Sequence, residues 1–158
     1  MLEHMPDIYV DADACPVKNE AVRVAQRHGL SLYMVSNSGL RRAMGAKVYG
    51  IMVDNTPDAA DHWIVEHAKA NDIVITADIL LANRCLEQQV WVIGPNGKRF
   101  NINNIGTALA LRELSAHLRE TGESKGYNPS FTPRDRSQFL QELEGVVQSA
   151  KRLIDGTS

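Results

Sequence analysis

Short apolar runs that alternate with helix-like segments constrain the fold of this chain more than any other feature. The first run, Ile8 to Val10, is unbroken, as expected of a strand buried on both faces of a parallel sheet. The later runs are Leu30 to Val35, Val48 to Val53, Ile73 to Ala77 and Val90 to Ile93. This pattern predicts a three-layer, Rossmann-like α/β fold, in which helices cover both faces of a mostly parallel five-stranded sheet.

The segments between these runs space their apolar residues at the period of a helix. Val17 to His28 is the first, and Gly29 is expected to end it. The other expected helices cover residues 58–69, 79–88 and 105–119, and a last amphipathic helix begins near Thr132. We expect the strand at Ile8 to Val10 to lie centrally, between the strands at residues 30–35 and 73–77.

The composition is that of a soluble globular protein and narrows the classes of function. The chain has 158 residues, 44% hydrophobic and 23% charged, which fits one domain with its own core. Its formal net charge of −2 argues against a protein that grips duplex nucleic acid, although it is compatible with an acidic nuclease site. Two cysteines and no membrane-length apolar run predict a cytoplasmic protein without a membrane partner.

The two ends of the chain are expected to lie outside the domain. Residues 1–4 resemble a cloning scar before Met5, and residues 154–158 are expected to form a disordered tail. A single α/β domain is therefore expected over residues 5–153. Within it, residues 121–133 are rich in Gly, Ser, Asn and Pro, which predicts a mobile loop.

Aspartates follow the predicted strands at the points where the strands end. Asp11 and Asp13 come directly after the first strand, and Asp78 follows the strand at residues 73–77. The carboxyl ends of parallel strands share one edge of the sheet, where open α/β sheets bind ligands. Three more acids are expected close to this edge: Asp54, Asp58 and Asp61. Clustered carboxylates repel one another, so they predict a site for a hard cation, Mg²⁺ or Mn²⁺.

Structural explanations compete with this prediction for each residue taken alone. Asp13 could simply cap the helix that begins after Cys15-Pro16, and Asp58 could cap the helix that follows it. Cys15, beside a helix N-terminus, could be a reactive thiol, although a buried small side chain is the commoner role of a lone cysteine. The cluster, rather than any single acid, is therefore the functional signal.

Motifs spread along nearly the whole chain also resemble one bacterial family. They are Y-V-D-A-D-A-C-P, S-N-S-G-L-R, D-A-A-D-H-W-I, D-I-V-I-T-A-D-I-L-L-A, G-P-N-G-K-R-F, N-N-I with a following A-L-R, and P-R-D-R-S-Q-F-L. In this order, from Met5 to about Leu153, they are similar to the YaiI/YqxD family, which is largely uncharacterised. That family resembles the PIN-like nucleases, which place acidic metal ligands at strand ends.

The resemblance implies two groups of site residues. The metal-binding and catalytic candidates carried over by motif are Asp11, Asp13, Asp61 and Asp78, with Asp58 as a further metal ligand. The implied substrate-binding residues are Asn37, Arg41, Asn104 and Arg112. Two positions depart from the family pattern: Asn103 stands where an acid is frequent, and K-G-Y-N-P-S-F replaces a segment richer in glycine and proline.

Together these features predict a Mg²⁺- or Mn²⁺-dependent nuclease that hydrolyses single-stranded RNA or, less favoured, DNA. Arg41 is expected to contact a substrate phosphate, because guanidinium pairs with phosphate through two hydrogen bonds. One alternative is a non-catalytic module of the same fold that binds RNA or protein. Another is a haloacid-dehalogenase-like phosphatase with Asp11 as nucleophile, Asp13 as acid–base and Ser36 at the phosphate. The sequence leaves the oligomeric state open.

Overall fold

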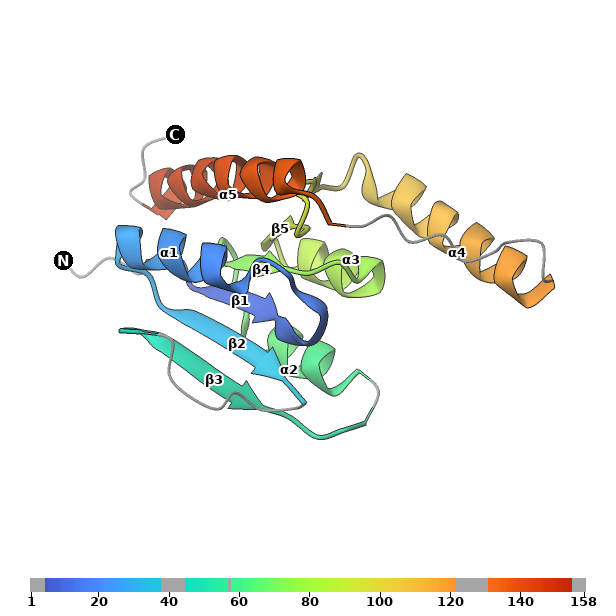
Figure 1. Ribbon diagram of the computed structural model, residues 1–158, viewed down its shortest axis with the longest axis horizontal. Helices are drawn as coiled ribbons and strands as arrows, with labels where there is room; N and C mark the ends of the chain where they lie inside the picture. The colour runs from blue at the N-terminus through green and yellow to red at the C-terminus, as the bar shows by residue number, and fades with distance from the viewer. Residues whose placement is uncertain (1–4, 38–44, 57, 122–130, 155–158) are drawn as a thin grey trace.

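The computed structural model describes residues 5–37, 45–56, 58–121 and 131–154, and it has the predicted three layers (Figure 1). A six-stranded sheet in the order β3-β2-β1-β4-β5-β6 forms the middle layer. The predictions for residues 1–4, for Arg41 in segment 38–44, for loop residues 122–130 and for the tail at 155–158 concern residues outside those described.

The five predicted strands all form and run parallel to one another. Their bounds are β1 Ile8–Asp11, β2 Leu32–Ser36, β3 Val48–Met52, β4 Ile73–Ile75 and β5 Trp91–Ile93. β1 pairs with β2 on one side and with β4 on the other. Ile8 and Val10 are accordingly fully buried. The predicted central place of the first strand is confirmed.

The sheet also has a sixth strand that the sequence prediction missed. β6, Arg99–Phe100, pairs antiparallel with β5. A tight turn precedes it, and Gly97 in that turn has a φ of 89°. A Cβ atom on Gly97 would lie 2.9 Å from backbone atoms of Gln138, so the turn requires glycine. Two residues are too few to show a periodicity, so the prediction of five strands is wrong by this short edge strand.

Helices cover both faces of the sheet and bury two separate cores. Their bounds are α1 Lys18–His28, α2 Ala59–His67, α3 Ile79–Glu87, α4 Ile105–Thr121 and α5 Pro133–Ile154, with a 3-10 turn η1 at Ala12–Ala14. α1 and α5 pack on one face, where Phe139 and Leu143 are fully buried. α2 and α3 pack on the other, where Ile64 and Leu81 are fully buried. With both faces covered, the edges of the sheet are left for polar side chains.

α4 reaches away from the three layers, on the side toward which the strand arrowheads point (Figure 1). Ile105 and Ala108 in its first turns join the core that contains α3. Leu111 and Leu114, further along, are 57% and 53% exposed. The helix itself was predicted, but its departure from the body of the molecule was not. No helix among the described residues is both long and apolar enough to span a membrane.

Candidate functional site

The strand order reverses between β1 and β4, and we refer to the carboxyl ends of these two strands as the crevice. The first three strands build the sheet outward to one side, and the chain then returns to add β4 on the opposite side of β1. In open α/β sheets, ligands bind at the carboxyl ends of the strands at such a reversal. Asp11 is the last residue of β1, and Asp78 lies between β4 and α3, directly before the first residue of α3. The two predicted acids therefore lie at the position where this architecture places a ligand.

Thr76 joins these two acids. Its hydroxyl donates a hydrogen bond to Asp11 Oδ2 over 2.9 Å and accepts one from the Asp78 backbone N–H over 3.0 Å. Thr76 is only 1% exposed, so both interactions are shielded from water. The sequence prediction did not include Thr76. Its signal was a hydroxyl residue two positions before the strand-terminal acid, in D-I-V-I-T-A-D.

Asp78 has a second, structural role at the start of α3. Its Oδ1 accepts hydrogen bonds from the backbone N–H groups of Leu80, over 2.9 Å, and Leu81, over 3.4 Å. The side chain is thus the N-cap of this helix, where a negative charge is also favoured by the helix dipole. Capping by the carboxylate and the hydrogen bond from the backbone N–H to Thr76 together fix the position of Asp78 at the start of α3.

Asp61 approaches the same place from α2. Its side chain is only 8% exposed and forms a hydrogen bond with Asp78. Burial, followed by the negative charges of Asp78, Asp11 and Asp58, raises the pKa of Asp61 to about 7. The prediction that Asp61 turns back toward the strand ends is consistent with this position. The raised pKa favours the protonated, uncharged form of Asp61 below neutral pH.

Asp11 also has a raised pKa. Burial is the main cause; the hydrogen bond from Thr76 opposes it, and the charges of Asp78 and Asp13 add to it. The negative charge of Asp78 thus raises the pKa values of both Asp11 and Asp61.

Asp13 and Asp58 lie beside this group but differ from the predicted alternatives. Asp13 accepts hydrogen bonds from the Ser36 hydroxyl, over 2.5 Å, and from the Asn37 N–H, over 3.1 Å. It therefore links η1 to the end of β2, and the alternative that it caps α1 is wrong, because the N-cap is Val17. Asp58 precedes α2 with a φ of 67° and makes no side-chain cap bond, so its predicted capping role is also wrong.

The predicted substrate-binding residues are dispersed. Asn37 is exposed at the end of β2, next to Asp13. Asn104 accepts from the Asn101 N–H and donates to the Arg99 carbonyl, which shapes the turn before α4. Arg112 is exposed on α4. In the described part of the chain, no hydrogen bond or ion pair connects Asn104 or Arg112 to the acids.

Cys15 does not have the properties of a reactive thiol. Its side chain is buried, and burial is the main cause that raises the pKa of the thiol. The thiolate is the reactive form of cysteine, and a raised pKa depletes it at neutral pH. The alternative role of a small buried side chain therefore fits better.

The chemistry of the crevice suits a hard cation, although the carboxylates are not arranged around one. Among the described residues, no three His, Cys, Asp or Glu side chains are grouped so that they could hold a metal ion. The groups at the crevice are nevertheless all oxygen donors, namely carboxylates and a threonine hydroxyl, as Mg²⁺ and Mn²⁺ prefer. Ligation would require Asp61 to lose its proton and the carboxylates to close in.

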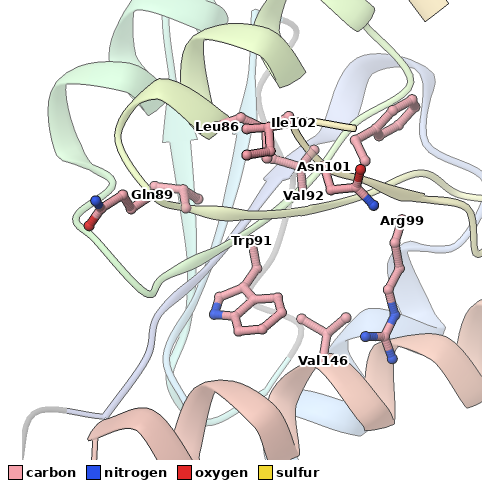
Figure 2. Close-up of a pocket in the computed structure, with 10 residues that line it drawn as sticks. Leu86, Gln89, Trp91, Val92, Arg99, Asn101, Ile102 and Val146 are labelled. Carbon is pink, nitrogen blue, oxygen red and sulfur yellow. The ribbon is translucent and has the colours of Figure 1, made fainter. Parts of the chain in front are cut away.

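A separate cavity of about 400 Å³ lies by the β5–β6 edge of the sheet (Figure 2). Its walls are mainly apolar, and in Figure 2 Trp91 and Arg99 point toward the helix that carries Val146. Arg99 donates to Glu142 over 2.8 Å, and none of the predicted acids lines this cavity. It is therefore distinct from the acidic crevice.

Comparisons with known proteins bear on the identity of the chain. A model of the uncharacterised YaiI/YqxD family matches residues 9–149. The chain belongs to the YaiI/YqxD family. It is 55% identical over 150 residues to the UPF0178 protein of Rhizobium etli, covering 95% of this chain and 97% of that relative. The UPF0178 protein of Agrobacterium fabrum is 54% identical over 152 residues, with 96% and 99% covered. No solved structure matches the chain.

Proposed function

We propose that this member of the YaiI/YqxD family is a Mg²⁺- or Mn²⁺-dependent nuclease that hydrolyses single-stranded RNA or DNA at the acidic crevice. The observation that carries the proposal is the bridge made by Thr76, which holds Asp11 and Asp78 at the reversal of the strand order. Asp61 adds a third carboxylate through its hydrogen bond to Asp78.

A purely structural role does not account well for these three acids. One aspartate suffices to cap α3, and Asp78 does so. Asp61 is buried beside other carboxylates, at a cost that raises its pKa to about 7. Groups with pKa values perturbed by burial and by like charges are concentrated at functional sites. A site that collects negative charge at the expense of stability supports the binding of a cation.

The acids of the crevice would have different roles toward a bound cation. When bound, Mg²⁺ or Mn²⁺ polarises a phosphoryl oxygen and lowers the pKa of a water molecule. Asp11 and Asp78 would hold the ion, since Thr76 fixes both of them. Asp61 and Asp13 would complete its surroundings directly or through water. Asp58, exposed at the start of α2, extends the negative field outward.

Two observations favour single-stranded nucleic acid over the alternatives. A net charge of −2 provides little attraction for the phosphates of a duplex. The phosphatase alternative assigns the Ser36 hydroxyl to phosphate, but this hydroxyl donates to Asp13 over 2.5 Å. A nuclease that positions flexible single strands by other contacts remains the best account of the site.

Cleavage of labelled oligonucleotides tests the proposal. Purified protein is incubated with single-stranded RNA and DNA in Mn²⁺, in Mg²⁺ and in chelator, beside Asp78→Asn and Glu87→Gln prepared in parallel. Glu87 is exposed at the end of α3 and serves as a matched loss of one charge. We expect metal-dependent cleavage by the parent and by Glu87→Gln, and none by Asp78→Asn.

Two outcomes would overturn the proposal. Cleavage that persists unchanged in Asp78→Asn would come from a contaminating nuclease. A parent protein that cuts no substrate but retards single-stranded RNA in a gel would be the non-catalytic binding module instead.

A further inference from the structure

A shallow cleft of about 420 Å³ lies between the end of β3 and the first turns of α2. Met52 and Val53 line it from the strand, and Trp63 lines it from the helix. Polar side chains at its borders are Asp54, Thr56, His62 and Glu66. Met52 is 71% exposed, so its side chain is accessible to a ligand in the cleft.

Stacked aromatic rings hold one wall of this cleft in place. Tyr9, Tyr33 and Tyr49 are at matching positions of three adjacent parallel strands, and their rings stack at centroid distances of 5.1 and 5.3 Å. Trp63 lies over this row, 6.1 Å from Tyr33. The Trp63 indole also stacks on the His67 ring, with 3.8 Å between the ring centroids. Trp63 is thus held rigidly between His67 and the tyrosine row, and it contributes an ordered aromatic side chain to the wall of the cleft.

The polar groups at the cleft favour a ligand that donates hydrogen bonds over an anionic ligand. Asp54 and Glu66 are exposed carboxylates, which accept hydrogen bonds and repel phosphate. The Arg84 guanidinium lies 3.4 Å from His62 Nδ1 and can only donate, so His62 presents an N–H at Nε2. The cleft therefore offers acceptors from two carboxylates and a donor from one ring. Amino groups and ring nitrogens of nucleobases complement this set.

The position of the cleft connects it to the acidic crevice. Asp61 and His62 are consecutive in the first turn of α2; Asp61 lies at the acids and His62 lines the cleft. The two sites therefore flank one helix turn, and an α-helix is about 10 Å across. A strand with a phosphate at the acids can place a neighbouring base at Trp63.

We propose that this cleft binds a nucleobase with an exocyclic amino group, belonging to a nucleotide next to the one that is cleaved. The proposal rests on the proposed nuclease function for its biological context, but the binding of a base is a separate property. It names a preference that the acids cannot provide: adenine, guanine and cytosine over uracil, which lacks an amino group.

Titration with nucleosides tests the proposal without phosphate, metal or cleavage. The chain has two tryptophans, whose indole N–H signals are resolved in a ¹H–¹⁵N spectrum and assigned with Trp91→Phe. We expect guanosine, adenosine and cytidine to shift the Trp63 signal saturably and uridine to bind at least about five-fold more weakly, the scale of one hydrogen bond. Trp91, whose indole donates to Asn71, is the internal reference and stays unmoved.

Two exposed side chains provide variants that leave the fold intact. Met52→Ala and Glu66→Gln should each weaken nucleoside binding roughly five-fold or more, as loss of an apolar contact or of a hydrogen bond does. Glu87→Gln should not change it. The proposal would be overturned if nucleosides left the Trp63 signal unmoved, or if both variants bound nucleosides as tightly as the parent. Spermidine shifting Trp63 as strongly as guanosine would identify a cation cleft instead. Cleavage activity without nucleoside binding would refute this inference alone, and nucleoside binding without cleavage would refute only the nuclease.

Discussion

The Asp61→Asn substitution should stabilise the metal-free protein at neutral and alkaline pH. Asparagine has nearly the shape of aspartate, and its amide can still donate to Asp78 as the protonated carboxyl does. At about 1.4 kcal/mol for each tenfold change in acidity, raising the pKa of Asp61 from 3.8 to about 7 costs the folded, ionised state about 4 kcal/mol. Because the asparagine amide is also desolvated, we expect a gain of about 2–4 kcal/mol in the free energy of unfolding.

The free energy of unfolding of the parent should decrease as the pH rises. The pKa of Asp61 is higher in the folded protein than in the unfolded chain, so the folded state binds more protons between about pH 4 and pH 7. The stability of the parent should fall as pH rises through this range and level off above it. At about pH 4, near the ordinary pKa of 3.8, the unfolded chain also takes up much of the proton, so Asp61→Asn should then differ from the parent by less than about 1 kcal/mol.

Urea denaturation followed by circular dichroism measures the effect. Unfolding curves of the parent, Asp61→Asn and Glu87→Gln are recorded in chelator at about pH 4, 6 and 8 and extrapolated linearly to zero urea. Glu87→Gln should match the parent within about 0.5 kcal/mol at every pH, as exposed substitutions usually do. If Asp61→Asn were less stable than the parent by the same amount at all three pH values, the reasoning would be refuted. The carboxylate would then be an ordinary structural acceptor.

Three further predictions follow from the contacts of the described residues. Mn²⁺ should raise the melting temperature of the parent in scanning calorimetry, and Asp11→Asn or Asp78→Asn should abolish that rise without weakening the metal-free fold. Thr76→Val should lower the free energy of unfolding in urea by about 1–3 kcal/mol and weaken the response to Mn²⁺, because it leaves the Asp78 N–H without its partner. Hydrogen bonds from His28 and Arg27 lower the pKa of Glu144 to about 2, so its contribution is present above about pH 4.5 and is lost as pH falls through 2. Glu144→Gln should therefore reduce stability by about 1 kcal/mol at pH 7 and by less near pH 2 in the same urea assay.

The sequence predicted the sheet well because burial on both faces leaves a clear pattern. The runs at Ile8 to Val10 and Ile73 to Ile75 are apolar and buried; Asp11 follows the first directly, and Asp78 follows the second after Thr76 and Ala77. Their meeting at one edge follows from parallel pairing alone. β6 has no such pattern, because two residues cannot show a period.

The details of the site were harder to predict, because they depend on which side chain reaches which neighbour. Both Asp58 and Asp78 directly precede a helix, but only the Asp78 side chain makes capping hydrogen bonds. The sequence could not show this difference, since the positive φ of Asp58 is a property of the folded chain. Thr76 was missed because a threonine in a strand is ordinary. The tyrosine row is also a matter of register: Tyr9, Tyr33 and Tyr49 are far apart in sequence and meet only through the pairing of β1, β2 and β3.

The central claim is that the acidic crevice is a cation site, and a calorimetric titration of Mn²⁺ into the metal-free protein tests it most directly. The parent and Glu87→Gln should bind Mn²⁺ saturably at millimolar concentrations or below, and Asp11→Asn and Asp78→Asn should show no saturable heat. Absence of saturable binding by the parent, or undiminished binding by Asp78→Asn, would contradict the claim.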